Sequence, residues 1–145
     1  MKILMVCLGN ICRSPLAHGV MQHLVQQEGL DWHIDSAGTG GWHVGEPPDR
    51  RAIAVARRHG IDISGQRAQQ FRARHLDEYD LVLAMDRSNL RNILSLTTDP
   101  ERRARVQLFL GDDEVPDPYY DDDLFEPVFQ LIEKRCQQLL EQLKR

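Results

Sequence analysis

Four short apolar runs are spaced along the chain and are separated by more polar segments. They span Lys2 to Val6, Trp32 to Ala37, Asp80 to Met85 and Val106 to Phe109. Buried parallel strands have this character, because both of their faces are covered and few of their positions are polar. The pattern therefore predicts four strands, in that order along the chain.

Amphipathic stretches follow these runs. The first starts near Pro15 and ends before Gly29, and its apolar side consists of Leu16, Ala17, Val20, Met21, Leu24 and Val25. A spacing of three and four residues is that of a helix. A second helix is predicted from Asp49, a good N-cap residue, to His59, with Gly60 as its end.

Two more helices are predicted in the second half of the chain. Asp86 or Ser88 is the candidate cap of a helix that runs through Leu96. The last helix carries an apolar stripe formed by Val128, Ile132, Cys136, Leu139, Leu140 and Leu143. The polar stretch from Ile61 to Tyr79 has no clear period and receives no assignment.

Strands that alternate with helices predict an α/β fold. We expect an open four-stranded parallel sheet, covered by helices on both faces through right-handed crossovers. In such sheets the ligand crevice lies beyond the carboxyl ends of the strands. The loop that begins at Cys7 and the acidic loop from Gly111 to Asp123 both follow predicted strands, so we expect them to meet at that edge.

Composition narrows the class of protein. A chain of 145 residues with 41% hydrophobic content fits one ordinary domain. The net charge is −4, and the basic residues of Arg50 to Arg74 are offset by the acidic cluster of Asp112 to Asp123, so we expect no nucleic-acid partner. No stretch resembles a membrane span or a signal peptide, so we expect no membrane insertion and a cytoplasmic location.

The cysteines and histidines do not suggest a metal site or a disulfide framework. The three cysteines include no CxxC pair, and none of their spacings matches a zinc site. The six histidines are scattered, and we interpret them as surface or loop residues. We therefore expect no metal and no cofactor. Cys136, on the stripe of the last helix, is expected to pack in the core.

The segment from Cys7 to Pro15, CLGNICRSP, joins the first predicted strand to the first predicted helix. Free N–H groups at a helix N-terminus bind anions and favour the ionised form of a nearby thiol. Cys7 would then be a nucleophilic thiolate, and the planar fork of Arg13 would bind two phosphate oxygens. The remaining oxygen contacts would come from the backbone of Leu8, Gly9, Asn10, Ile11 and Cys12.

Other residues of the segment suit the same chemistry. Gly9 and Asn10 tolerate left-handed backbone angles, which allow successive N–H groups to face one centre. Ser14 is expected to cap the helix, with Pro15 at its first position, and to hydrogen-bond the Cys7 sulfur. The loop lacks the GK[ST] ending of nucleotide-binding loops. A CxxxxxR spacing alone is weak evidence for a catalytic site. A non-catalytic phosphate-binding module that uses the same loop is therefore an alternative interpretation.

The segment resembles the loop of the low-molecular-weight protein tyrosine phosphatases of bacterial type. The family loop CxGNxCRSP matches Cys7 to Pro15, DPYY matches Asp117 to Tyr120, and DSAGT at Asp35 to Thr39 is also similar. The resemblance covers nearly the whole chain. It implies a flavodoxin-like, phosphotyrosine phosphatase I-like fold and one low-molecular-weight phosphatase domain over residues 1–145. It also implies metal-independent hydrolysis of phosphotyrosine through a phosphocysteine on Cys7.

The resemblance assigns roles that spacing alone leaves open. Asp117 would act as general acid and then as general base, although other aspartates stand nearby at positions 112, 113, 121, 122 and 123. An aromatic slot for the phosphotyrosine ring would be formed by Trp42, Tyr119 and Tyr120. For Trp42, a partly buried anchor of its own loop is an equally good interpretation.

Two further roles follow from the resemblance. Asn10 would hold the shape of the loop with help from Ser36. Family members also carry the second loop cysteine, here Cys12, which would form a disulfide with Cys7 under oxidation and protect it from overoxidation. The alternative is that Cys12 is a small loop residue without a redox role. We favour reversible protection.

Two related enzymes are the nearest alternatives. A thioredoxin-linked arsenate reductase would need two further cysteines, and the region from Asp80 to Asn92 has none. A protein arginine phosphatase would have Thr in place of Ile11 and a non-tyrosine residue in the pair of Tyr119 and Tyr120. A phosphotyrosine-containing protein is therefore the favoured substrate. The resemblance suggests a tyrosine autokinase as partner, and a monomer or weak self-association as oligomeric state.

Overall fold

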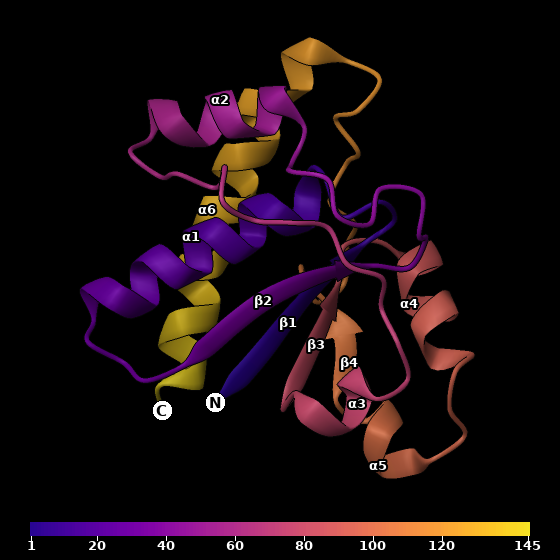
Figure 1. Ribbon diagram of the computed structural model, residues 1–145. Helices are drawn as coiled ribbons and strands as arrows, with labels where there is room; N and C mark the ends of the chain where they lie inside the picture. The colour runs from indigo at the N-terminus through magenta and orange to yellow at the C-terminus, as the bar shows by residue number, and fades with distance from the viewer.

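The computed structural model describes all 145 residues and contains the four predicted parallel strands. They are β1 (Lys2–Cys7), β2 (His33–Gly38), β3 (Leu81–Ala84) and β4 (Val106–Leu108). The order across the sheet is β2-β1-β3-β4, and each neighbouring pair is parallel. β1 and β3 are therefore the two interior strands (Figure 1).

Helices cover both faces of this sheet (Figure 1). On one side lie α1 (Arg13–Gln27), α2 (Arg50–Arg58) and α6 (Phe125–Leu143). The other side holds α3 (His75–Glu78), α4 (Arg87–Leu94) and α5 (Pro100–Arg103). A short 3₁₀ helix, η1 (Asp122–Leu124), leads into α6. None of the helices has the length and apolar character needed to cross a membrane.

The side chains of β1 alternate between two cores. Ile3, Met5 and Cys7 belong to the larger core, which β1 shares with α1 and α6, whereas Leu4 and Val6 belong to the smaller core with α3 and α4. All five side chains are buried. This alternation places Cys7 at the carboxyl end of the strand on the α1 side, where the chain continues into α1.

Element boundaries differ from the sequence predictions by one or two residues. β2 begins at His33 rather than Trp32 and includes Gly38, and α4 ends at Leu94, before the predicted Leu96. The pattern does not predict α5, because four residues are too short for a periodic signal, although Asp99 caps it. The unassigned stretch of residues 61–79 is irregular until α3.

Two histidines that were predicted at the surface are buried. His18 is 9% exposed and His75 is 2% exposed. Burial lowers the pKa of both side chains, because the charged imidazolium is poorly solvated there. Each ring has a polar partner: His18 Nδ1 lies 3.2 Å from Ser36 Oγ, and His75 Nδ1 accepts the Arg72 N–H at 2.8 Å. A neutral, hydrogen-bonded imidazole can thus occupy a core position that a polarity pattern assigns to the surface.

Candidate active site

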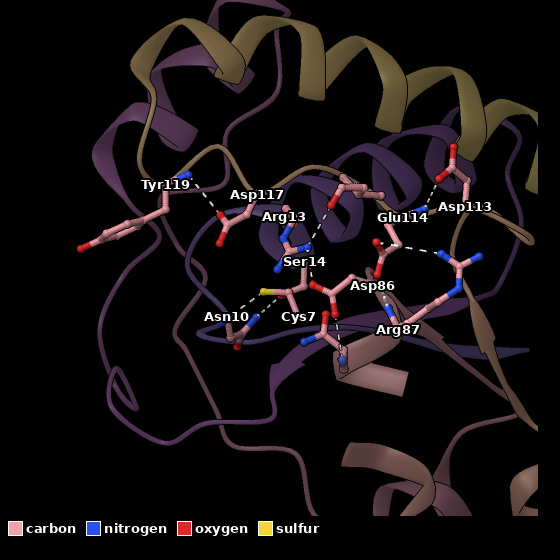
Figure 2. A network of polar contacts seen from close by, with 12 residues as sticks. Cys7, Asn10, Arg13, Ser14, Asp86, Arg87, Asp113, Glu114, Asp117 and Tyr119 are labelled. Atoms are coloured by element: carbon pink, nitrogen blue, oxygen red, sulfur yellow. Dashed lines mark hydrogen bonds and ion pairs between the residues drawn. The ribbon is translucent and has the colours of Figure 1, made fainter. Parts of the chain in front are cut away.

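The Cys7 loop (residues 7–13) folds around the Cys7 sulfur at the carboxyl end of β1. The Asn10 N–H donates to Cys7 Sγ at 3.2 Å, and Ser14 Oγ lies 3.0 Å from the same sulfur (Figure 2). Asn10 has φ of 57° and is the one non-glycine residue with a positive φ. This left-handed residue reverses the backbone so that its N–H points back to the sulfur.

The Asn10 side chain holds the loop to its surroundings. Its Nδ2 donates to Ser14 Oγ at 2.8 Å and to Ser36 Oγ at 3.0 Å, while its Oδ1 accepts the Gln69 N–H at 3.0 Å. Ser36 in turn contacts His18. The sequence gives no signal for Gln69, because the group that it contributes is a backbone N–H.

Most N–H groups of the loop have no acceptor within the protein. Asn10 donates to the sulfur, but no protein acceptor engages the N–H groups of Leu8, Gly9, Ile11, Cys12 and Arg13. Buried or half-buried N–H groups are almost always paired, so a run of free donors at a helix N-terminus is typical of an anion site.

Ser14 does not cap α1, so this prediction is wrong. The helix begins at Arg13, its N-cap position is Cys12, and no side chain caps it. Pro15 is therefore the third helical residue rather than the first. The Ser14 hydroxyl is already engaged by Asn10 Nδ2 and Cys7 Sγ, whereas a capping role would turn it toward the N–H groups of its own helix.

Arg13 is held beside the loop by partners from distant parts of the chain. Its side chain is 5% exposed, and Nη1 donates to Asp86 Oδ2 at 2.8 Å and to the Val115 carbonyl at 2.9 Å (Figure 2). Nε and Nη2 donate to no protein group. Sequence reasoning found Asp86 only as a helix cap, and it does cap α4 by accepting the Asn89 N–H. Its ion pair with Arg13 was missed.

A pocket of about 300 Å³ opens over the Cys7 loop. Its lining consists of Cys7, Leu8, Gly9, Ile11, Cys12, Arg13, Trp42, His43, Asp117, Tyr119 and Tyr120. The Trp42 side chain lines the pocket and is 71% exposed, so most of its ring faces solvent. His43 was not among the predicted residues, and Glu46 holds its ring at 2.5 Å.

Asp117 reaches this pocket from the segment between β4 and α6 (Figure 2). Its Oδ1 accepts the Tyr119 N–H at 3.1 Å. The five other aspartates of the acidic loop do not line the pocket. Spacing could not choose among these carboxylates, whereas the fold brings Asp117 alone to the side of Cys7 and Arg13.

The three cysteines are free and differ in their surroundings. Burial, followed by the charge of Asp49, raises the pKa of the Cys12 thiol well above its ordinary value, and burial does the same for Cys136 in the core. Both are therefore protonated at neutral pH. Only the Cys7 sulfur accepts a backbone N–H. No group of three or more potential ligand side chains is arranged to hold a metal.

Comparison with known proteins gives one consistent result. Residues 2–145 match the family model described as low molecular weight phosphotyrosine protein phosphatase. The protein of that name from Homo sapiens is 38% identical, over 97% of this chain and 94% of its own. The crystal structure of YfkJ from Bacillus subtilis has a TM-score of 0.92 at 39% identity, covering 99% of this chain and 94% of that one. Vibrio vulnificus Wzb, solved with benzylphosphonate, has a TM-score of 0.87 at 32% identity and 97% coverage of both chains.

Proposed function

The chain belongs to the low molecular weight phosphotyrosine protein phosphatase family, and we propose that Cys7, Arg13 and Asp117 carry its chemistry. It is a protein-tyrosine phosphatase, so the arsenate reductase, arginine phosphatase and non-catalytic alternatives are not favoured. The observation that carries the residue assignment is that these three side chains line one pocket together with a loop in which five N–H groups have no acceptor in the protein.

In the first half-reaction, the Cys7 thiolate attacks the phosphorus atom of phosphotyrosine. The bond from phosphorus to the phenolic oxygen breaks, and the Asp117 carboxyl gives its proton to that oxygen. The loop N–H groups and the Arg13 fork bind the three non-bridging oxygens, whose charge they stabilise in the transition state. The products are tyrosine and a phosphocysteine on Cys7.

In the second half-reaction, water attacks the phosphorus atom. The Asp117 carboxylate takes a proton from the water, and the bond from sulfur to phosphorus breaks with its electron pair returning to the sulfur. A hydrogen bond from the Ser14 hydroxyl stabilises the departing thiolate, which lies 3.0 Å away. Inorganic phosphate then leaves and the free enzyme is restored.

An aromatic slot formed by Trp42, Tyr119 and Tyr120 would select the phenyl ring of the substrate. These side chains are among the exposed large hydrophobic residues, and the two tyrosine rings meet edge to face at 5.0 Å. When the phosphate group of phosphotyrosine is bound at the Cys7 loop, its phenyl ring lies between these aromatic side chains. The phosphoserine side chain is shorter, so its main chain would collide with the same aromatic side chains. The benzylphosphonate bound by Wzb is an aryl ligand of the same kind.

A series of aryl phosphates tests the residue assignment. The parameter kcat/KM reports transfer to Cys7, even where hydrolysis of the phosphocysteine limits kcat. We expect Asp117→Asn to lower kcat/KM by about 10²-fold or more for phenyl phosphate, and much less for p-nitrophenyl phosphate, whose leaving group needs no proton. Cys7→Ser should abolish turnover of both. Equal losses of kcat/KM for both substrates in Asp117→Asn would contradict the role of Asp117 as general acid.

We further propose that residues 1–145 act as one phosphatase domain in the cytoplasm, as a monomer or weakly self-associating protein, on a tyrosine autokinase. Support comes from the resemblance to bacterial family members and from the need of a thiol nucleophile for reducing surroundings. Substrate trapping with Cys7→Ser tests the partner: capture of a tyrosine-phosphorylated kinase supports it, and capture of other phosphoproteins alone contradicts it.

A further inference from the structure

The acid segment (residues 116–124) carries both Asp117 and Tyr119 but has few polar contacts with other parts of the protein. Pro118 is buried and Leu124 packs against the core, and the segment continues into α6. Apart from that continuation, each hydrogen bond or ion pair that it makes with the rest of the chain involves one side chain, Arg51 on α2.

Arg51 contacts the acid segment in two ways. Its Nη1 donates to Asp122 Oδ1 at 2.5 Å, and its guanidinium carbon lies 5.4 Å from the centre of the Tyr119 ring. The same guanidinium lies 4.7 Å from the ring centre of Phe125, the first residue of α6. A guanidinium within about 6 Å of two ring centres attracts both rings, so these contacts restrict the movement of Tyr119 and Phe125 as well as that of Arg51.

The other side of the Arg51 fork is joined to the Cys7 loop. Nε and Nη2 each donate to the Asp49 carboxylate at 3.0 Å, and the Asp49 N–H donates to the Ile11 carbonyl at 2.8 Å. Burial by itself would raise the pKa of Asp49, but the hydrogen bonds from Arg51 hold it below its usual range. This pair is therefore charged over the pH range of an ordinary assay.

We propose that Arg51 is a positioning residue for catalysis, which holds the acid segment against the Cys7 loop so that Asp117 and Tyr119 keep their places in the pocket. The proposal rests on the roles given to those residues in the proposed function. Arg51 itself does not line the pocket, so it acts through other residues. A displacement of about 1 Å at the reacting groups is enough to cost about 10²-fold in rate.

The chemistry of the fork makes arginine specific at this position. One planar group donates in two directions, to Asp49 and to Asp122, while its faces remain free for the rings. A lysine ammonium keeps the charge but cannot span both carboxylates with fixed geometry. Arg50 is its natural control, because it is adjacent, exposed and forms no ion pair.

Kinetics provide the first test. We expect Arg51→Met to lower kcat/KM for phenyl phosphate by about 10- to 100-fold, with a smaller loss for p-nitrophenyl phosphate, since proton donation by Asp117 is impaired. Arg51→Lys should fall between Arg51→Met and the unchanged chain, and Arg50→Met should stay within about twofold. The proposal would be overturned if Arg51→Met lowered kcat/KM equally for both substrates while Asp117→Asn lowered it unequally.

Hydrogen exchange provides the second test and does not depend on the role of Asp117. We expect backbone exchange in residues 116–124 to become about tenfold faster in Arg51→Met and to stay unchanged in Arg50→Met and Asp117→Asn. Asp122→Asn, which removes the charge of one exposed partner but keeps an acceptor oxygen, should give a smaller change in the same residues. Unchanged exchange in both Arg51→Met and Asp122→Asn would overturn the proposal. By contrast, an equal loss of kcat/KM for phenyl phosphate and p-nitrophenyl phosphate in Asp117→Asn would overturn the proposed function.

Discussion

Arg13 and Asp86 form an ion pair of 2.8 Å between residues that follow the two interior strands, β1 and β3. The chain leaves β1 toward β2 and returns to place β3 on the other side of β1, so this pair lies at the point where the strand order reverses. Open α/β sheets bind their ligands at such a point. The topology thus fixes the orientation of the guanidinium that faces the Cys7 loop.

Asp86→Asn tests this relationship. The variant can still cap α4, but it loses the charge that orients Arg13, which keeps only its bond to the Val115 carbonyl. We expect kcat/KM for p-nitrophenyl phosphate to fall by about 10-fold or more, and the free energy of unfolding by about 2 kcal/mol. Asp99→Asn is the matched control, since Asp99 caps α5 at an exposed site. Similar changes in both variants would contradict the special role of Asp86.

Ser14→Ala separates the two half-reactions. Without its hydroxyl beside the Cys7 sulfur, the thiolate is a poorer leaving group, so we expect hydrolysis of the phosphocysteine to slow by about 10²-fold. Rapid mixing with p-nitrophenyl phosphate should then show a burst of nitrophenol close to the enzyme concentration. Ser88→Ala, on the exposed side of α4, should behave like the unchanged protein. A loss in kcat/KM without a larger burst would contradict this role.

The buried histidines predict how stability depends on pH. His18 and His75 have pKa values lowered by burial, although Asp35, 3.9 Å from His18, opposes part of the shift. The unfolded chain therefore binds protons that the folded protein does not, once the pH falls below about 6.5. We expect the free energy of unfolding to decrease from about pH 7 to about pH 5, above the range where carboxylates dominate.

Urea denaturation at several pH values measures this dependence. The double variant His18→Asn, His75→Asn should be less sensitive to pH over the same range, because its asparagines keep a hydrogen-bond acceptor but do not titrate. His23→Asn, on α1 but not among the buried residues, should leave the dependence as it is. A double variant with the full pH dependence would contradict the assignment to these two side chains.

Oxidation tests the role of Cys12. The predicted protection requires that a sulfenic acid on Cys7 condense with the Cys12 thiol, which releases water and forms a disulfide. Treatment with hydrogen peroxide should therefore inactivate the protein in a way that dithiothreitol reverses. In Cys12→Ser the loss should become largely irreversible, while Cys136→Ser, in the core, should recover like the unchanged protein. Full recovery of Cys12→Ser would favour the small loop residue without a redox role.

Local sequence patterns predicted those parts of the structure that depend mainly on residues close together in the chain. The four strands, the helices between them and the Cys7 loop follow from short runs whose periodicity and turn residues act over a few positions. The burial of His18 was not predicted, because it depends on partners in other segments. The position of the Ser14 hydroxyl was predicted wrongly for a similar reason. Local rules favour a helix cap, whereas in the fold the hydroxyl contacts Asn10 and Cys7 instead.

Contacts between distant segments were the part that sequence could not supply. The pair of Arg13 and Asp86 spans 73 positions, and that of Arg51 and Asp122 spans 71. The first pair depends on the strand order that places β1 beside β3, and the second depends on how α2 packs near the start of α6; no spacing in the chain encodes either arrangement. Asp117 was found only through the DPYY resemblance, because six aspartates in one acidic loop are equivalent until the fold places them.

Trapping the covalent intermediate shows whether Cys7 is the nucleophile. Ser14→Ala is mixed with phenyl phosphate, quenched in acid within the first turnover, and digested for mass spectrometry of the peptide that contains Cys7. We expect a phosphoryl group bonded to the Cys7 sulfur and absent from Cys12 and Cys136, with a yield that approaches the amount of enzyme. Turnover that continues while Cys7 is never phosphorylated, or a phosphoryl group on another residue, would contradict the role of Cys7 as nucleophile.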